Sequence, residues 1–428
     1  MTSWGCTSVE GGLGERAVAR CDQLGVPPFS ERADQLTRRY LTPAHAASLE
    51  ALRRWMREAG MSVRCDGAAN LVGRYEGLAA GAPALLIGSH IDTVRAAGRY
   101  DGALGVLLGI DCVDALSRAR RRLPFAVEVI AFGDEEGSRF PTSMTCSRAV
   151  AGTVDPGLLA MRDADGLNLD EARAAFAEPL GPIAAAARAP GDVLAYLEAH
   201  IEQGPVLEAR GLPVGVVTAI AAQKRLRLTI TGVAGHAGTT PMSLRRDPGP
   251  AAAEAILLIE RICGGSEDLV GTVGRIEARP GAYNVIPGSV EFTIDIRAPI
   301  SSARDVALES ILAGVEAIVA RRGLGLSIEL VQDLPESPSD PALTAMLEAA
   351  VRSTGVAPLR LASGAAHDAM VMAALCPTAM LFIRCKAGVS HNPAESVDPA
   401  DAAVAARAML AFIDALADTP AGAPRRSA

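Results

Sequence analysis

Histidine is scarce in this chain, and most of the histidines lie where metal binding or proton transfer is possible. The 428 residues contain six histidines, of which His45 lies in an ordinary helical stretch, PAHAASLEAL. The other five lie beside Gly, Asp, Glu or Pro at the ends of strand-like runs: His90, His200, His236, His367 and His391. Because neutral imidazole is a common ligand for zinc and manganese, this repeated placement favours a metal centre.

The segment GSHIDTVRAAGRYDG (88–102) supplies two candidate ligands. An apolar run, ALLIG, ends in His90, and Asp101 follows in a glycine-rich turn. Ligand groups gather at the carboxyl ends of strands in open α/β sheets, and a carboxylate can bridge two ions. Asp92 is placed to accept the second ring N–H of His90. The alternative is a plain turn stabilised by aspartate side chains.

The segment FGDEEGSRF (132–140) places three acids, Asp134, Glu135 and Glu136, directly after the apolar run FAVEVIAF. Adjacent acids at a buried strand end repel one another and are costly to bury without a cation. We therefore expect one glutamate to bind metal and its neighbour to face the reacting water. A solvated acidic loop is the alternative.

Further segments complete a possible ligand set of two histidines, two carboxylates and a third histidine. They are EAHIEQGPVLE with His200 and Gln203, HNPAES with His391, GHAGTTPM with His236, and SGAAHDAM with His367. Each segment is weak evidence alone.

The pattern of apolar runs predicts an α/β fold. Strand-like runs at 70–75, 84–88 and 125–132 alternate with a helical run at 105–116, which indicates a largely parallel sheet. Residues 213–330 instead read β-α-β-β-α-β, a ferredoxin-like α+β unit. We predict a discontinuous catalytic domain, 1–212 and 331–428, with 213–330 inserted as a smaller domain. The apolar residues of 28–60 recur at helical spacing, which predicts a helix there.

Composition and charge exclude several classes of protein. A net charge of −8 disfavours a nucleic-acid or anionic-membrane binder, because both need concentrated positive charge. The eight cysteines form no C-x-x-C pair, and the first residues show no basic and apolar leader. We expect a cytoplasmic enzyme with reduced cysteines.

These motifs, in this order, resemble the amidase branch of the M20 metallopeptidase family. That branch contains allantoate amidohydrolases, N-carbamoyl-L-amino acid hydrolases and β-ureidopropionases. The resemblance runs from about residue 30 to 415 and rests on GSHIDTV…DGALGV, FGDEEGSRF, HIEQGPVLE, GHAGTTPM, NVIPGSVEFTIDIR and SGAAHDAM…GVSHNPAE. Peptidase members usually place a carboxylate where this chain has His200, so HIEQG is typical of the amidase branch.

The resemblance implies a di-metal catalytic domain and an inserted dimerisation (lid) domain. His90 and His200 would bind the first of two Mn²⁺ or Zn²⁺ ions, Glu136 and His391 the second, and Asp101 both. Glu135 would be the general base, and His236 would stabilise the oxyanion. The implied substrate-binding residues are Gln203, His236, Asn284, Arg297 and His367. The inserted domain would also form a homodimer and offer residues to the partner's site.

Two departures from the family pattern leave every ligand in place. The loop before the bridging aspartate reads Ala97-Gly98 where two glycines are common, and SGAGHD is replaced by SGAAHD, with Ala366. Arg297, expected to pair with a substrate carboxylate, has a surface ion pair as its alternative role.

The implied activity is hydrolysis of a linear, non-peptide C–N bond in a small carboxylate. We expect allantoate, which would give ureidoglycine or ureidoglycolate, ammonia and carbon dioxide. The alternatives are an N-carbamoyl-L-amino acid hydrolase or a β-ureidopropionase, then an M20-type dipeptidase or a non-catalytic binding relative.

Overall fold

The computed structural model describes residues 12–419, which divide into two compact units. The large unit runs to Thr218 and includes Ser339–Leu361 and the chain from His367 onward. The small unit is Ala219–Pro338 with Ala362–Ala366. The predicted boundary at 330 falls inside the strand Gly325–Leu334, whereas that at 213 lies directly before strand β6, which still pairs with β16 of the large sheet.

A mixed nine-stranded sheet forms the centre of the large unit, in the order β1-β2-β4-β3-β5-β16-β6-β14, with β15 paired to β6. The four central strands are parallel: β4 (Ala126–Phe132), β3 (Ala84–His90), β5 (Val193–Ile201) and β16 (Thr378–Ile383). The outer strands are antiparallel to their neighbours: β1 (Ser62–Cys65), β2 (Leu71–Tyr75), β6 (Val214–Ile220) and β14 (Ser337–Pro338). Strand β15 covers Arg360–Ser363. The sequence therefore predicted the parallel centre and not the antiparallel flanks.

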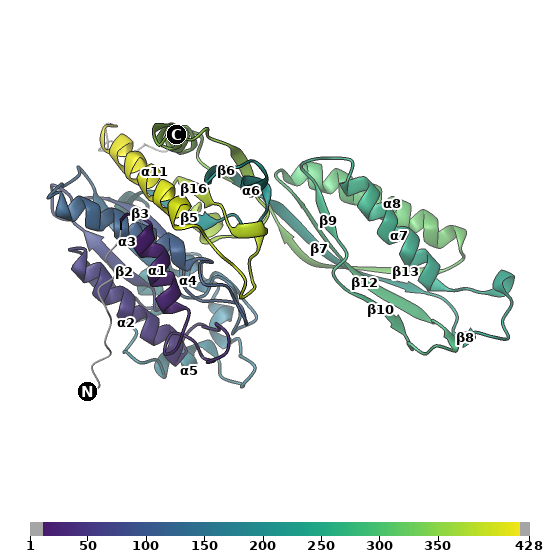
Figure 1. Cartoon of the computed structure of the whole chain (residues 1–428). Helices are drawn as coiled ribbons and strands as arrows, with labels where there is room; N and C mark the ends of the chain where they lie inside the picture. The colour runs from purple at the N-terminus through teal and green to yellow at the C-terminus, as the bar shows by residue number, and fades with distance from the viewer. Residues whose placement is uncertain (1–11, 420–428) are drawn as a thin grey trace. The chain divides into compact units, whose positions relative to one another are not determined.

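Helices cover this sheet, and Figure 1 shows α1, α3 and α11 lying together over it. The helices of the large unit are α1 (Glu15–Leu24), α2 (Pro43–Glu58), α3 (Ala103–Arg118), α4 (Thr145–Ala151), α5 (Leu169–Ala174), α6 (Val206–Ala209), α9 (Pro341–Ser353), α10 (Asp368–Met372) and α11 (Pro399–Ala417). Short 3-10 turns occupy Pro156–Ala160, Ile183–Ala186, Pro190–Asp192 and Lys386–Gly388.

Three of these helices begin with an acceptor side chain followed by proline. Thr42, Asp340 and Asp398 each accept a backbone N–H of the first turn, and a proline follows each. Proline fits the first helical position because no partner is needed for its missing N–H. The helical periodicity predicted for 28–60 is wrong before Pro43, since 28–42 contains turns and one isolated bridge.

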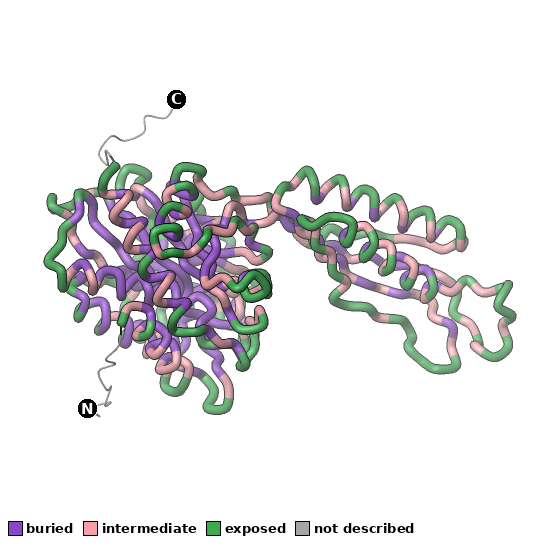
Figure 2. Tube along the Cα trace, turned by 45° about the horizontal axis from the view of Figure 1, so that its top comes forward, coloured by how far each residue is buried: buried purple, intermediate pink, exposed green. Residues whose placement is uncertain are grey.

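The central strands are buried from end to end. Every residue of β3, β4 and β16 is buried, so both faces of the sheet centre are covered (Figure 2). Continuous apolar runs are typical of such strands, which explains why they were readable from the sequence. Within residues 12–419, no helix combines the length and apolar character that a membrane span requires.

The small unit follows the order read from its sequence, except that the second predicted strand is divided into β9 and β10 and that the short strands β8 and β11 are additional. Its antiparallel sheet runs β10-β12-β7-β13, with β9 also paired to β12. The elements are β7 (Ala222–Thr231), β8 (Gly235–His236), α7 (Pro248–Cys263), β9 (Val270–Thr272), β10 (Ile276–Arg279), β11 (Val285–Ile286), β12 (Ser289–Ala298), α8 (Ser301–Arg321) and β13 (Gly325–Leu334), with a 3-10 turn at Met242–Leu244. Helices α7 and α8 pack on one face, where β12 buries every second residue (Figure 1).

His45 is a structural residue, as its sequence context indicated. It is fully buried in α2, its Nδ1 accepts the backbone N–H of Leu41, and its ring packs against Tyr40 and Phe176. Burial lowers the pKa of His45 to about 3. The protein therefore folds with this ring neutral over most of the pH range.

We predict that His45 destabilises the fold as the solution becomes acidic. The unfolded chain binds a proton at His45 near pH 6.5, whereas the folded chain binds it only near pH 3, so stability falls as pH drops through this window. The full effect is on the order of 5 kcal/mol. His45→Asn keeps an acceptor for Leu41 and cannot titrate. Chemical denaturation at several pH values should show that the free energy of unfolding depends less steeply on pH in the variant, by at most the contribution of one proton. Parallel curves of the two proteins would contradict the prediction.

Candidate metal centre

Neighbouring strands deliver the candidate ligands to one edge of the large sheet. His90 is the last residue of β3, Glu135 and Glu136 follow β4, and His200 lies near the end of β5. The chain after β16 brings His391 to the same edge. Because β3, β4, β5 and β16 are parallel, their carboxyl ends meet, which is where such sheets bind ligands.

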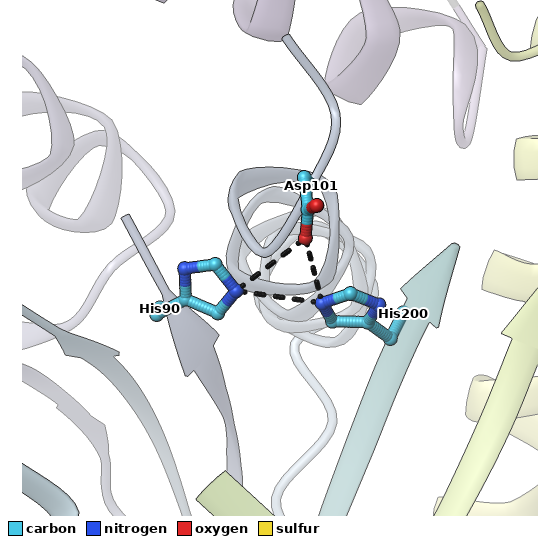
Figure 3. A group of neighbouring side chains, drawn as sticks. All are labelled: His90, Asp101 and His200. Carbon is cyan, nitrogen blue, oxygen red and sulfur yellow. Dashed lines mark hydrogen bonds and ion pairs between the residues drawn. The ribbon is translucent and has the colours of Figure 1, made fainter. Parts of the chain in front are cut away.

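The first group of ligands is buried and tightly converged. Nε2 of His200 is 3.1 Å and Nε2 of His90 is 3.5 Å from Oδ1 of Asp101. The two Nε2 atoms lie 3.4 Å apart. Figure 3 shows the two rings and the carboxylate pointing toward one common space. All three side chains are almost completely buried.

The outer ring nitrogens show that this space suits a cation. Nδ1 of His90 is 3.0 Å from the carbonyl oxygen of Asp92, and Nδ1 of His200 is 2.9 Å from that of Ile201. A carbonyl oxygen only accepts, so each Nδ1 carries a proton, and in the neutral form of each ring the Nε2 lone pair faces Asp101. Two lone pairs and a carboxylate then face one another, an arrangement that a divalent cation satisfies.

Without a cation, these rings keep protons. Burial disfavours charge on His90, but the hydrogen bonds to Asp101 and Asp92 outweigh burial and raise its pKa well above the usual value. Burial also favours the neutral form of His200, but the hydrogen bond to Asp101 outweighs burial and raises the pKa of His200. Metal ions and ring protons therefore compete for the same lone pairs.

A second group shares Asp101 with the first. Nε2 of His391 lies 3.3 Å from Oδ2 of Asp101 and 3.3 Å from Oε1 of Glu136. These hydrogen bonds raise the pKa of His391 to about 10. The His391 side chain is half exposed, whereas Asp101 is buried. The two oxygens of Asp101 thus face two different sets of nitrogen and oxygen ligands.

Glu135 lies beside the first group without belonging to it. Its Oε2 is 3.9 Å from Nε2 of His90. Burial raises the pKa of Glu135 well above its usual value, opposed by His90 and reinforced by Glu136. A buried carboxylate with a raised pKa can accept and return a proton. Its burial excludes the solvated acidic loop that the sequence left open.

Asp92 supports the site with different atoms from those expected. The backbone carbonyl of Asp92 is the closer acceptor for Nδ1 of His90, since its carboxylate lies 3.5 Å away. The carboxylate instead accepts the backbone N–H groups of Glu135 at 3.0 Å and Glu136 at 3.1 Å. Asp92 therefore holds the strand end that carries both glutamates.

Glu198 also supports the site, and the sequence reading assigned it no role. The buried Glu198 forms a possible metal-binding group with His200 and His367. However, Oε1 accepts the hydroxyl of Ser89 at 2.9 Å, and Oε2 accepts the backbone N–H of Ala369 at 2.9 Å. Glu198 thus fixes the start of α10. An acid inside the apolar strand LAYLEAHI was the available signal.

His367 and Gln203 belong to the same site. His367 is buried, and its ring centroid lies 4.4 Å from that of His200. Burial, with His200 nearby, lowers the pKa of His367 well below the usual value, so the ring is neutral. Gln203 donates from Nε2 to Oδ2 of Asp101 at 2.8 Å, while its buried Oε1 has no hydrogen-bond partner.

The other predicted substrate residues lie in the small unit. His236 is exposed in strand β8, which pairs with β11, and Asn284 is exposed in the loop before β11. The backbone carbonyl of Asn284 accepts the backbone N–H of Ala237. Arg297 already has partners. Its Nε and Nη2 donate to the two oxygens of Asp295, both at 2.8 Å, and Nη1 donates to the carbonyl of Gly364. The ion pair considered from the sequence is therefore present.

Comparisons with known proteins show the family to which the chain belongs. The family model for peptidase family M20/M25/M40 matches residues 86–415. The chain is 42% identical to the N-carbamoyl-L-amino acid amidohydrolase of Geobacillus stearothermophilus, covering 92% of this chain and 97% of the relative. It is 40% identical to the allantoate deiminase of Arabidopsis thaliana, covering 94% and 82%.

A solved structure shows the same fold. The hydantoinase/carbamoylase family amidase of Burkholderia ambifaria is 34% identical, with a TM-score of 0.87, covering 95% of this chain and 97% of the relative. Amidases that act on carbamoyl and ureido compounds therefore recur among the similar proteins.

We predict that Asp92→Asn weakens metal binding. An amide has only one acceptor oxygen, so one of the N–H groups of Glu135 and Glu136 would face an NH₂ group and the strand end would shift. Loss of such support typically costs about 10–100-fold in metal affinity. Calorimetric titration of the metal-free protein with Mn²⁺ measures this loss. Asp34→Asn, which changes an exposed aspartate, is the control; equal affinities in all three proteins would contradict the prediction.

Proposed function

We propose that this chain acts on allantoate in the cytoplasm. The chain belongs to peptidase family M20/M25/M40 and hydrolyses carbon–nitrogen bonds other than peptide bonds. The observation that carries the proposal is one buried carboxylate, Asp101, shared by two ligand groups beside the buried acid Glu135. Such a site can activate water against a resonance-stabilised ureido carbon, which is a poor electrophile.

The proposed metal assignment follows the two groups. His90 and His200 would hold one ion, Glu136 and His391 would hold the other, and Asp101 would be shared by the two groups. Imidazole and carboxylate ligands suit Mn²⁺ and Zn²⁺. When bound, the two ions supply Lewis-acid activation of the attacking water and of the carbamoyl oxygen.

Glu135 is the proposed general base and acid. It takes a proton as water attacks the carbamoyl carbon, and returns it to the departing nitrogen as the C–N bond breaks. Ammonia leaves, and the resulting N-carboxylate loses carbon dioxide to give the amine. Burial raises the pKa of Glu135, which favours the protonated form that returns the proton to the departing nitrogen.

His236 is the proposed donor to the developing oxyanion. Its Nδ1 accepts the backbone N–H of Gly238 at 3.0 Å. In a neutral ring this places the proton on Nε2, which can then donate a hydrogen bond. Asn284, from the neighbouring loop, is the proposed second donor of the small unit.

Gln203 and His367 are proposed to bind the substrate's ureido group. The unpaired Oε1 of Gln203 can accept a ureido N–H, which would satisfy a buried acceptor. The neutral His367 can hydrogen-bond the substrate without adding a second positive charge beside the metal ligands.

Arg297 is proposed to bind the substrate carboxylate in exchange for Asp295. Asp295 also accepts from Nε of Arg225 at 2.9 Å and from Nε2 of Gln223. Asp295 would therefore remain paired if Arg297 turned to a substrate, which lowers the cost of the exchange. Two arginines around one aspartate leave a net positive charge for a carboxylate.

The polar character of these residues supports allantoate, which carries two ureido groups and no apolar side chain. An N-carbamoyl-L-amino acid is the second candidate, because the Geobacillus relative bears that name at 42% identity. Both reactions use the same metal ligands and the same base. The residues that contact the rest of the substrate, beside the hydrolysed ureido group, therefore decide which substrate is preferred.

A homodimer formed through the small unit is part of the proposal. Strand β13 is the outer strand of its sheet and carries exposed Leu330 and Val331. An outer strand with free backbone groups and apolar side chains can pair with a second copy.

We predict ammonia release from allantoate when the metal-free protein is supplied with Mn²⁺ or Zn²⁺. Allantoate and a panel of N-carbamoyl-L-amino acids, including N-carbamoylglycine and N-carbamoyl-leucine, are compared by kcat/KM. Allantoate should be hydrolysed fastest, and exhaustive chelation should abolish activity reversibly. If a carbamoyl amino acid is hydrolysed fastest, the proposed substrate is wrong and the enzyme class stands. Activity after exhaustive chelation would contradict the metal centre.

We predict that Glu135→Gln abolishes turnover and retains both metal ions. The amide preserves size and cannot accept the proton, so kcat should fall at least about 10²–10⁴-fold. Initial-rate assays measure turnover, and metal analysis of the same preparation measures binding. Near-normal turnover, or loss of the ions, would show that Glu135 is not the base.

A further inference from the structure

A carboxylate outside the two ligand groups joins the loops that carry Asp101 and His391. Oε1 of Glu395 accepts the backbone N–H of Tyr100 at 2.7 Å and that of Asp101 at 3.1 Å. Oε2 lies 3.0 Å from the hydroxyl of Ser390. These contacts connect positions nearly 300 residues apart in the chain.

Ser390 extends this connection to the ligand atoms. Its hydroxyl lies 2.7 Å from Oδ2 of Asp101, the oxygen that faces His391. Gln203 donates to the same oxygen. Ser390 and Gln203 therefore orient Oδ2 of Asp101, the oxygen assigned to the second ion. The other oxygen, Oδ1, faces His90 and His200.

The packing around Glu395 indicates a built arrangement. Glu395 is 5% exposed, and a side chain at Gly98 would lie 2.1 Å from its carboxyl carbon. Gly98 is the glycine that remains in the Ala97-Gly98 departure from the family pattern. A glycine is required there because the carboxylate occupies the space where its Cβ would stand.

The turn that presents Glu395 also presents His391. The backbone N–H of Glu395 donates to the carbonyl of Asn392 at 3.0 Å, and the side chain of Asn392 accepts from Ala394. His391 itself has a φ of 54°, a left-handed conformation that the surrounding turn must maintain. A shift of Glu395 would therefore move His391 and Asp101 relative to each other.

We propose that Glu395 is a positioning residue that sets the geometry of the second metal site by tying the Asp101 loop to the Ser390–His391 turn. It binds neither ion. It acts on the site through backbone N–H groups and the Ser390 hydroxyl. The inference rests on the proposed two-ion assignment and is independent of the substrate.

The test is a calorimetric titration of the metal-free, full-length protein with Mn²⁺ alone. Glu395→Ala should weaken the second ion at least about tenfold, while the first ion, held by buried His90 and His200, changes less than about threefold. Glu395→Gln should bind both ions like the parent. Its amide oxygen can accept both N–H groups, and its NH₂ can donate to Ser390, whose own proton then serves Asp101.

Two further variants separate positioning from general stability. Ser390→Ala keeps the backbone hydrogen bonds and removes the link to Oδ2, so it should weaken the second ion by a smaller factor than Glu395→Ala. Glu208→Ala is the matched control: Glu208 accepts the backbone N–H of Ala387 on the same connection and does not contact Asp101 or Ser390. It should leave both affinities unchanged.

The proposal is overturned if Glu395→Ala binds both ions like the parent, if it weakens both ions equally, or if Glu395→Gln fails to restore binding. If Glu395→Ala does not fold, an unchanged second affinity in Ser390→Ala overturns it, and selective loss supports it. Failure of the parent to bind two ions would overturn the metal assignment itself, which distinguishes that failure from an error about Glu395.

Discussion

The structure depends on a buried carboxylate, Asp101, that three imidazole rings approach. Its oxygens face His90 and His200 on one side and His391 on the other. Burial alone would raise the pKa of Asp101, yet hydrogen bonds to these rings hold it well below the usual value. Burying an ionised carboxylate is costly unless positive charge accompanies it, and divalent ions supply that charge most completely. The surrounding residues serve to hold this one carboxylate and its partners in place.

Most of that support comes from carboxylates that bind backbone N–H groups. Asp92 holds the end of β4, Glu198 holds the start of α10, and Glu395 holds the loop before α3. Each uses a charge-assisted hydrogen bond to the main chain, which is stronger than a neutral one and leaves the ligand side chains free. The ligands are therefore positioned through the backbone of three loops, and a small shift in any loop alters distances at the site.

The small unit carries three of the proposed substrate-binding residues. Its His236, Asn284 and Arg297 are partly or fully exposed, and its cation Arg297 is held in an ion pair with Asp295. Exposure alone does not separate the two sets of candidates, because His391 is half exposed, while His367 and Gln203 lie beside the buried ligands.

The sequence by itself identified the candidate ligands, the parallel strands and most of the helix and strand order of the small unit. Continuous apolar runs mark buried strands, and an acid or histidine directly after such a run must lie at the strand end. The tertiary structure alone decided which oxygen of Asp101 faces which ring, that Arg297 already has a partner, and that Asp92 and Glu395 act on backbone N–H groups. These facts depend on contacts between segments up to about 300 residues apart, and no local pattern encodes the direction of a side chain across that separation.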